Sequence, residues 1–127
     1  RTDSDRIRLA NQYVWLFFGF SGRASRAAYA LAGLLLYMAR VFPIYRIVQA
    51  GGDESVEAYW GGMFLLVIGV TLISHIALSV KRLHDMNQSG WWSLLMLVGD
   101  FLFYLVLCFI PGTNGPNRYG SRPDSPT

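Results

Sequence analysis

Polar and apolar positions along this chain fall into long blocks. Three windows with few charges run over residues 27–48, 60–80 and 91–110. Each is about 20 residues long, which at about 1.5 Å per residue is enough for a helix to cross a hydrocarbon core of about 30 Å. The pattern therefore predicts three transmembrane helices at these positions.

Residues 1–20, before the first window, follow a different pattern. Four apolar side chains fall at helical spacing on one side, and most of the charged and amide groups lie on the other. These apolar residues are Ile7, Ala10, Val14 and Phe17. An amphipathic helix of this kind, with several bulky aromatic residues, is typical of a helix lying in the membrane interface. A helix packed on a partner protein is the alternative.

After the third window, residues 111–127 are rich in Gly, Pro, Asn and Ser and are expected to form an irregular tail. The predicted fold is thus an all-α integral membrane protein with an interfacial amphipathic N-terminal helix and three transmembrane helices. These elements are expected to form a single membrane domain over residues 1–127.

Composition supports this fold class over a soluble one. The 127 residues are 53% apolar and only 15% charged, against a usual charged share of about 25%. A soluble chain of this size has too little polar surface to cover three such apolar helices. The net charge is only +3, and the apolar windows supply no exposed basic face, so no nucleic-acid partner is expected.

Charge on the connecting segments predicts the orientation of the chain. Residues 1–26 carry five arginines and two aspartates, the 51–57 loop carries three acids and no base, and the 81–90 loop begins with a lysine and an arginine. Positive charge collects on the cytoplasmic or matrix side of a bacterial or organelle inner membrane. The N-terminus and the 81–90 loop are therefore predicted inside, and three crossings would place the tail outside. Arg118 and Arg122 in the tail argue mildly against that last step.

Two groups of small residues are spaced for helix packing, because they let two membrane helices approach closely. Alanines recur every four residues around the start of the first window, and two glycines lie seven apart in the second. These residues are Ala24, Ala28, Ala32, Gly62 and Gly69. Four tryptophans near helix ends are expected to act as anchors at the headgroup level. They are Trp15, Trp60, Trp91 and Trp92.

The ionisable side chains of Arg40, His75 and Asp100 lie deep inside the windows and need partners, because lipid offers none. Arg40 and Asp100 lie about 20 Å and about 14 Å from the predicted inner ends of their helices. The long Arg40 side chain can cover this difference, so we predict an ion pair or hydrogen bond between them. The alternative is that Arg40 reaches outward to the interface. His75 is expected to hydrogen-bond with Ser79 or with a neighbouring chain.

The polar segment KRLHDMNQSGWW, residues 81–92, separates the second and third windows. Lys81 and Arg82 suit both the C-terminal dipole of a helix and anionic lipid headgroups. His84 and Asp85 would diverge by about 100° on a helix, so they do not form a dyad by themselves. No Ser or Cys nucleophile motif and no metal-ligand spacing accompanies them. The sequence therefore predicts no enzyme, no cofactor and no metal site, with Asp85 pairing with Arg82 or capping the turn.

Three blocks in this chain also resemble those of a known family. They are FSGRASRAAYA before the first window, KRLHDMNQSGWW after the second, and GTNGPNRYG after the third. In this order and spacing they resemble the signature blocks of the DUF805 family, over residues 15–123. The resemblance implies a small helical protein of a bacterial inner membrane whose biochemical role is not established. It also implies one polar cluster built from the three blocks, with the candidate members Arg23, Arg26, Arg82, His84, Asp85 and Asn117.

These features favour a non-catalytic polytopic membrane protein, an accessory or scaffold subunit that packs against other helices of a larger membrane complex. Its expected partners are the lipid bilayer and other membrane subunits. The alternative is an oligomeric small transporter or channel component that uses Arg40, His75 and Asp100. Three helices are too few to enclose a pore, so this alternative needs several copies. A third class is an enzyme acting on lipid or quinone headgroups through His84 and Asp85.

Overall fold

The computed structural model describes residues 3–124, and within this range the chain forms helices joined by irregular segments. The helices are α1 (Asp3–Phe18), α2 (Arg26–Gln49), α3 (Glu54–Asp85), the 3₁₀ helix η1 (Gly90–Leu95) and α4 (Met96–Phe109). Three segments, namely α2, α3 and η1 with α4, are long and apolar enough to cross a membrane by length and composition. The prediction of an all-helical membrane protein with three such segments is confirmed.

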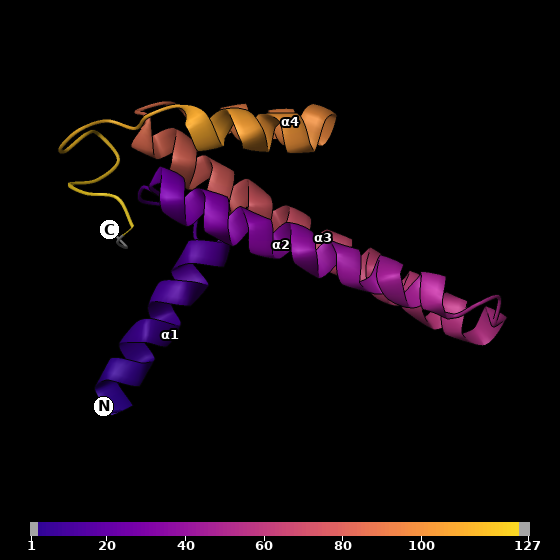
Figure 1. The fold of residues 1–127 in the computed structure, drawn as a ribbon. Helices are drawn as coiled ribbons and strands as arrows, with labels where there is room; N and C mark the ends of the chain where they lie inside the picture. The colour runs from indigo at the N-terminus through magenta and orange to yellow at the C-terminus, as the bar shows by residue number, and fades with distance from the viewer. Residues whose placement is uncertain (1–2, 125–127) are drawn as a thin grey trace.

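Helices α2 and α3 form a long antiparallel hairpin (Figure 1). Gly51 and Gly52 join them with φ values of +62° and +95°, a left-handed backbone that glycine adopts without a steric penalty. Asp53 then caps α3 by accepting hydrogen bonds from two backbone amides. At about 1.5 Å per residue, the 32 residues of α3 extend over about 48 Å, which exceeds the hydrocarbon thickness of about 30 Å.

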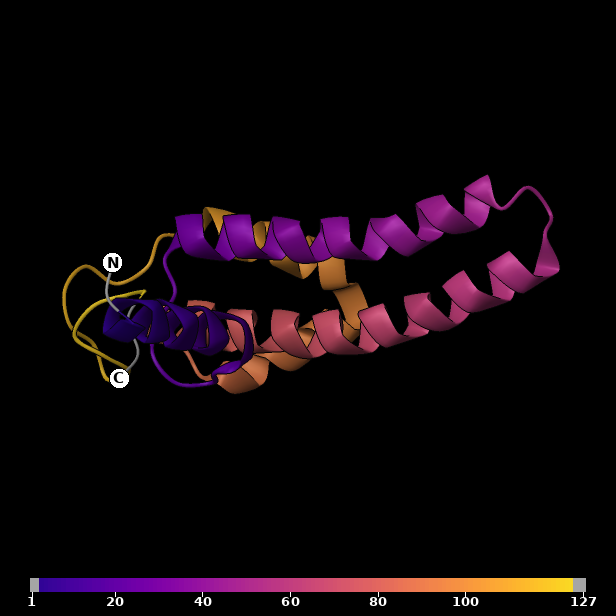
Figure 2. The same cartoon turned by 90° about the horizontal axis from the view of Figure 1, so that it is seen from below.

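The third apolar segment reverses its direction beside this hairpin. Gly99 has φ −142° and ψ +71°, which interrupts the helix. After this break, α4 runs back toward the end where α2 begins (Figure 2). Two contacts place the end of α4 beside the start of α2. Tyr104 Oη donates to the Ala30 carbonyl at 2.5 Å, and Arg26 Nη1 donates to the Phe109 carbonyl at 3.4 Å.

We call residues 90–109 the re-entrant hairpin, and its geometry corrects the predicted path of the chain. The tail was expected on the side opposite the 81–90 loop. Instead the described part of the tail, residues 110–124, lies at the same end as that loop, with the Thr113 amide 2.7 Å from the Asp85 carbonyl. Residues 125–127 lie outside the described range. The expectation failed because a break at one glycine leaves the mean hydropathy of a 20-residue window unchanged.

The core is confined to the half of the molecule where α2 begins and α3 ends. Every buried residue of α3 lies between Thr71 and Asp85. The opposite half, residues 41–70, contains a single buried residue, Pro43. We call residues 41–70 the outer arm. The core cluster itself consists of Tyr29, Ala32, Leu36, Leu78, Leu83, Met96, Tyr104 and Leu107.

Helix α1 projects from this core end at a steep angle to the α2–α3 hairpin (Figure 1). None of its residues is buried, and it is attached mainly by its last turn, where Ser74 Oγ donates to the Phe17 carbonyl at 2.7 Å. Ile7 and Val14 remain exposed to 61% and 63%. A helix is therefore present within the predicted range 1–20, while residues 1 and 2 lie outside the described part. Its position in a membrane interface stays a prediction.

Candidate functional site

The first polar cluster lies at the core end of the bundle, where the tail folds back over α3. Asp85 binds two arginines, because its Oδ1 accepts from Arg23 Nε at 3.0 Å and its Oδ2 accepts from Arg82 Nη1 at 2.5 Å. The side chains of both arginines are fully buried. We call Arg23, Arg82 and Asp85 the tail-closed cluster, because the backbone of the tail completes it.

Backbone carbonyls supply the other acceptors of this cluster. Arg23 donates to three tail carbonyls, those of Thr113 at 2.7 Å, Gly115 at 2.7 Å and Gly120 at 3.1 Å. Arg82 donates to the carbonyls of Ala24 at 3.1 Å, Leu107 at 3.0 Å and Ile110. A buried charge is tolerated only when it is paired and hydrogen-bonded. One carboxylate cannot neutralise two guanidinium groups, so these carbonyl dipoles stabilise the remaining positive charge.

Close contacts hold the tail against α3. A Cβ atom at Gly112 would overlap the Asp85 carboxylate, so this approach requires glycine. Asn117 Nδ2 donates to the His84 carbonyl at 2.9 Å. Farther along, Asp124 Oδ1 accepts from the Ser25 amide at 2.8 Å. The tail is therefore irregular in backbone and yet fixed at several points.

Lys81 has a different role from the one expected. The sequence suggested contact with lipid headgroups, but Lys81 is fully buried. Its Nζ donates to the carbonyls of Trp15 at 2.5 Å, of Gly19 at 2.9 Å, and of Leu16. The last carbonyls of a helix lack partners within the helix and carry partial negative charge. Lys81 therefore caps the C-terminal end of α1 and attaches α1 to α3.

His84 is held from two sides. Its Nδ1 lies 3.0 Å from the Gly22 carbonyl, and its ring stacks on Tyr119 with centroids 3.9 Å apart and an interplanar angle of 5°. A carbonyl can only accept a hydrogen bond, so Nδ1 carries the proton. In a neutral imidazole Nε2 is then an acceptor.

The structure brings five of the six candidates implied by the family resemblance into this one region. Arg23, Arg82, His84, Asp85 and Asn117 are linked through the contacts above. Arg26 is exposed and lies at the margin, where its side chain donates to the Phe109 carbonyl at the long distance of 3.4 Å. A function for these residues beyond folding stays a prediction.

A second polar cluster lies midway along α2 and joins α2, α3 and α4. Arg40 Nη1 donates to Asp100 Oδ2 at 2.9 Å, and Arg40 Nε donates to Thr71 Oγ1 at 2.8 Å. Tyr37 Oη donates to the other carboxylate oxygen of Asp100 at 2.7 Å. The third donor of Arg40, Nη2, lies 2.8 Å from His75 Nδ1. We call Tyr37, Arg40, Thr71, His75 and Asp100 the mid-bilayer cluster, after the depth that the sequence predicts for Arg40 and Asp100.

The contact with Arg40 fixes the proton on His75. A guanidinium group has no acceptor, so His75 Nδ1 must accept and the proton of the neutral ring sits on Nε2. This Nε2 is buried and has no hydrogen-bond partner among the described residues. A buried donor left without a partner costs about 1–3 kcal/mol. Ser79, the partner suggested for His75, pairs instead with Tyr29 Oη at 2.9 Å.

The mid-bilayer cluster is partly open to its surroundings. The Arg40 side chain is 13% exposed and the Asp100 side chain is 32% exposed. A cleft of about 260 Å³ runs along the cluster, lined by Arg40, Ile68, Leu72, Met96, Leu97 and Asp100. The mid-bilayer cluster is therefore accessible to a second molecule, whereas the buried side chains of the tail-closed cluster are not.

The two predicted packing faces have different surroundings. The alanine face lies inside the chain, since Ala24 and Ala32 are 0% and 6% exposed and Ala28 is half-buried. The glycine face has no neighbour within residues 3–124, because a Cβ atom at Gly62 or Gly69 would meet nothing within 4 Å there. Their role in packing against another protein stays a prediction.

The tryptophans lie near both ends of the α2–α3 hairpin. Trp60 lies on the outer arm, where its ring packs edge-on against Phe42. Trp91 and Trp92 begin the re-entrant hairpin and are 79% and 56% exposed. Trp15 Nε1 donates to the Ser21 carbonyl at 2.8 Å beside Lys81. Their anchoring at lipid headgroups stays a prediction.

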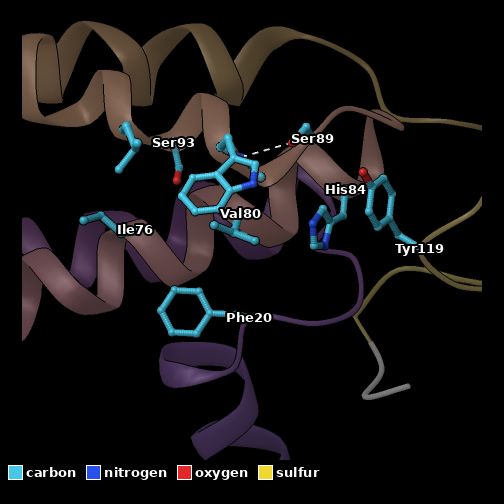
Figure 3. Close-up of a pocket in the computed structure, with 10 residues that line it drawn as sticks. Phe20, Ile76, Val80, His84, Ser89, Ser93 and Tyr119 are labelled. Carbon is cyan, nitrogen blue, oxygen red and sulfur yellow. Dashed lines mark hydrogen bonds between the residues drawn. The ribbon is translucent and has the colours of Figure 1, made fainter.

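A pocket of about 510 Å³ opens beside His84 (Figure 3). Its lining comes from the segment before α2, from α3, from η1 and from the tail. These residues are Phe20, Ile76, Val80, His84, Ser89, Gly90, Trp91, Ser93, Leu94 and Tyr119. Within residues 3–124, no group of three His, Cys, Asp or Glu side chains is placed to hold a metal ion.

Sequence reasoning missed several members of these sites. It did not place Tyr37 and Thr71 beside Arg40, because hydroxyl side chains within an apolar window give no separate signal. It did not anticipate that tail carbonyls would bind Arg23, since backbone acceptors have no sequence signature. A signal for the side of the tail did exist, namely Arg118 and Arg122, which fit the same end as the other basic segments.

Comparison with known proteins matches this chain to a family and to individual relatives. The model of the family described as "Protein of unknown function (DUF805)" matches residues 17–121. Inner membrane protein YhaI of Escherichia coli strain K12 is 37% identical over 110 residues, which cover 84% of this chain and 87% of that protein. Inner membrane protein YhaH of the same strain is 28% identical over 120 residues, which cover 92% of this chain and 93% of that protein. No solved structure is significantly similar.

Proposed function

Because this chain belongs to the DUF805 family of membrane proteins of unknown function, we propose a function from its geometry: a non-catalytic membrane subunit that packs against helices of a larger membrane complex. One observation carries the proposal, and it is the exposed break in the re-entrant hairpin. Val98 is 90% exposed, and a Cβ atom at the adjacent Gly99 would meet nothing within 4 Å. We call residues 97–100 the hairpin tip.

The hairpin tip lies at bilayer depth. It contacts Arg40, which is about 20 Å along α2 from its first residue. Non-helical backbone at this depth is tolerated only where protein or a water-filled cavity surrounds it, because lipid cannot satisfy the interrupted hydrogen bonds. An exposed tip that bears a charged side chain therefore favours a protein surface as its neighbour.

The outer arm offers a second surface for such a neighbour. Gly62 and Gly69 share one face of α3 with the exposed side chains of Leu66 and Ile73. Glycines without a neighbour, between large apolar side chains, permit close approach of another membrane helix. Lipid alone would fill this face less well, since helix packing in membranes depends on shape complementarity.

Cysteine cross-linking in native membranes tests the proposal. Val98→Cys in a Cys108→Ser background places a single thiol at the hairpin tip, and Leu31→Cys, 70% exposed near the start of α2, is the matched lipid-facing control. We expect Val98→Cys to give one cross-linked species of constant mass, containing a second membrane protein, and Leu31→Cys to give none. Equal and diffuse cross-linking of both variants would contradict the proposal.

A small transporter that works as a homo-oligomer is the second candidate. The re-entrant hairpin favours it, because broken helices beside charged side chains line the binding sites of many transporters. Arg40, His75 and Asp100 lie together at such a break. In the same cross-linking experiment this candidate predicts that Val98→Cys links only copies of this chain.

We also propose that the core end faces the cytoplasm or matrix. The exposed bases Arg26 and Arg118 lie at this end, whereas Asp53 and Glu54 lie at the tip of the outer arm. The positive-inside rule favours this orientation. It puts α1, the turn at residues 86–89 and the tail on one side.

A further inference from the structure

The pocket beside His84 has the dimensions of a ligand site. Its volume of about 510 Å³ falls within the range of about 300–1,000 Å³ that small-molecule sites occupy. Four separate segments of the chain line it, so it is a built cavity between elements. Figure 3 shows Phe20 on one side, with Ile76 and Val80 of α3 and the rings of His84 and Tyr119 around the same space.

The lining is polarised along α3. His84, Ser89 and Tyr119 provide three of the four hydroxyl- or imidazole-bearing side chains of the lining at the end of the bundle, where α3 stops and the tail begins, and the fourth, Ser93, lies farther toward Ile76. Ile76 lies eight residues earlier on α3, which is about 12 Å deeper. A molecule in this pocket would keep its polar part at the helix ends and its apolar part toward the bilayer interior. That is the orientation of a membrane amphiphile.

His84 offers a defined hydrogen-bonding atom to such a molecule. The Gly22 carbonyl holds the proton on Nδ1, which leaves Nε2 as an acceptor. Within residues 3–124, no donor is placed to hydrogen-bond this Nε2. Gly90 keeps access open, because a Cβ atom there would lie 3.3 Å from Nε2 and 2.8 Å from Val80 Cγ1. Stacking on Tyr119 fixes the direction in which the ring points.

We propose that this pocket binds a membrane amphiphile whose head group donates a hydroxyl hydrogen bond to Nε2 of His84. Two abundant classes of molecule with this chemistry serve as probes. One is a phospholipid with a glycerol head group, and the other is a hydroquinone with an isoprenoid tail. The site is independent of the subunit role proposed above, because it lies apart from the hairpin tip and the outer arm.

Nitrogen NMR on ¹⁵N-histidine-labelled protein tests this directly, because the chain has only two histidines. The protein is placed in lauryldimethylamine oxide micelles, a detergent without hydroxyl groups. Before ligand is added, Nε2 of His84 is expected to resonate as an unprotonated nitrogen. Dioleoylphosphatidylglycerol or a short-tailed hydroquinone is then expected to move it in a saturable way. Spectra of His75→Asn and His84→Asn assign the signals, and either variant alone suffices.

Ligands without a donor provide the chemical control. Phosphatidylcholine and the corresponding quinone should leave the Nε2 signal in place. A shift with phosphatidylglycerol alone identifies the lipid as the source, and a shift with the hydroquinone alone identifies the quinol. No saturable shift with either, or an equal shift with phosphatidylcholine, overturns the proposal. A protonated Nε2 in the ligand-free spectrum also overturns it.

Gly90→Ala tests the location of the site. Its methyl group would crowd Nε2, and loss of one neutral hydrogen bond should raise the apparent Kd by about tenfold. Gly69→Ala is the matched control, because a Cβ atom there meets nothing within 4 Å. Unchanged affinity in a folded Gly90→Ala variant would place binding elsewhere and overturn the assignment.

Discussion

The tail-closed cluster and the mid-bilayer cluster both pair arginine with aspartate, yet their surroundings differ. Arg23 and Arg82 are fully buried beside an Asp85 side chain that is 7% exposed, whereas Arg40 and Asp100 are 13% and 32% exposed. The first cluster draws most of its acceptors from the backbone, whereas the contacts between helices in the second join side chains to side chains. Backbone acceptors are in place only when the chain has its native path, so a cluster that depends on them forms only in the folded protein. Side chains that pair with one another can instead pair with a second molecule without any change in the path of the backbone.

This difference separates a cluster that closes the fold from one that is available to other molecules. The tail-closed cluster joins the segment before α2, the end of α3, α4 and the tail around one carboxylate, so its loss should release several elements at once. The mid-bilayer cluster links α2 and α3 to the hairpin tip, beside a cleft and a His75 Nε2 that has no hydrogen-bond partner within residues 3–124. The first is expected to govern stability and the second to govern interaction.

The largest effect concerns the position of the tail, because the tail-closed cluster exists only if the third segment turns back. Single cysteines at Gln88, Ser121 and Glu54 in a Cys108→Ser background report the side of each segment. We expect an impermeant maleimide to label Gln88→Cys and Ser121→Cys only from the cytoplasmic or matrix side, and Glu54→Cys only from the other. The measurement is labelling of right-side-out and inverted vesicles. If Ser121→Cys labels with Glu54→Cys, the third segment crosses the membrane.

Asp85→Asn should cost the most stability of any single change considered. The amide keeps the size of the side chain but removes the one negative charge shared by Arg23 and Arg82. Breaking a buried ion pair in this way costs about 3–5 kcal/mol, a large part of the about 5–15 kcal/mol that stabilises a typical domain. Thermal unfolding in detergent measures the loss. Glu54→Gln, at an exposed carboxylate, serves as the control, and equal melting temperatures for the two variants would contradict the contrast.

Asp100→Asn should cost less, about 1–3 kcal/mol. Asp100 is partly exposed, and Arg40 keeps its contacts with Thr71 and His75 after the change. A double-mutant cycle with Arg40→Met isolates the pair, with an expected coupling free energy of about 0.5–3 kcal/mol. An unchanged melting curve for Asp100→Asn would show that the predicted pair contributes nothing. A loss as large as that of Asp85→Asn would remove the distinction between the two clusters.

The sequence predicted the features of this fold that depend on composition. It did not predict the reversal of the third segment, which depends on the backbone conformation of Gly99. The three apolar windows gave the helices α2 and α3 and the composition of the third segment. The reversal at Gly99 was invisible, because a glycine in an apolar window is also common in a straight membrane helix. Because the reversal was not predicted, the tail was predicted on the wrong side of the molecule.

The candidate sites divide in the same way. Arg40 and Asp100 were matched by their depth along two helices, and the structure places them 2.9 Å apart. The predicted depth of Asp100 assumed a straight third helix. It agrees with the structure because Asp100 directly follows the break at Gly99, so the chain between Ser89 and Asp100 has not yet turned back. Lys81 was misplaced at the lipid surface, because its acceptors are carbonyls at the end of α1. Contacts between a side chain and a distant backbone leave no pattern in the sequence.

The smallest expected effect is at Asp53, which belongs to neither cluster and supplies an exposed reference. The Ser55 hydroxyl donates to Asp53 Oδ1 at 2.8 Å, and this bond, with the amides of Val56 and Ser55, lowers the pKa of Asp53. A lowered pKa in the folded state gives stability that is present above the pKa of the unfolded chain. That stability is lost as pH falls through the folded pKa. The melting temperature of Asp53→Ala should therefore lie slightly below that of the unaltered protein at pH 7, and the gap should narrow in acid. A gap that stays constant with pH would show that the charge of Asp53 is not what stabilises the start of α3.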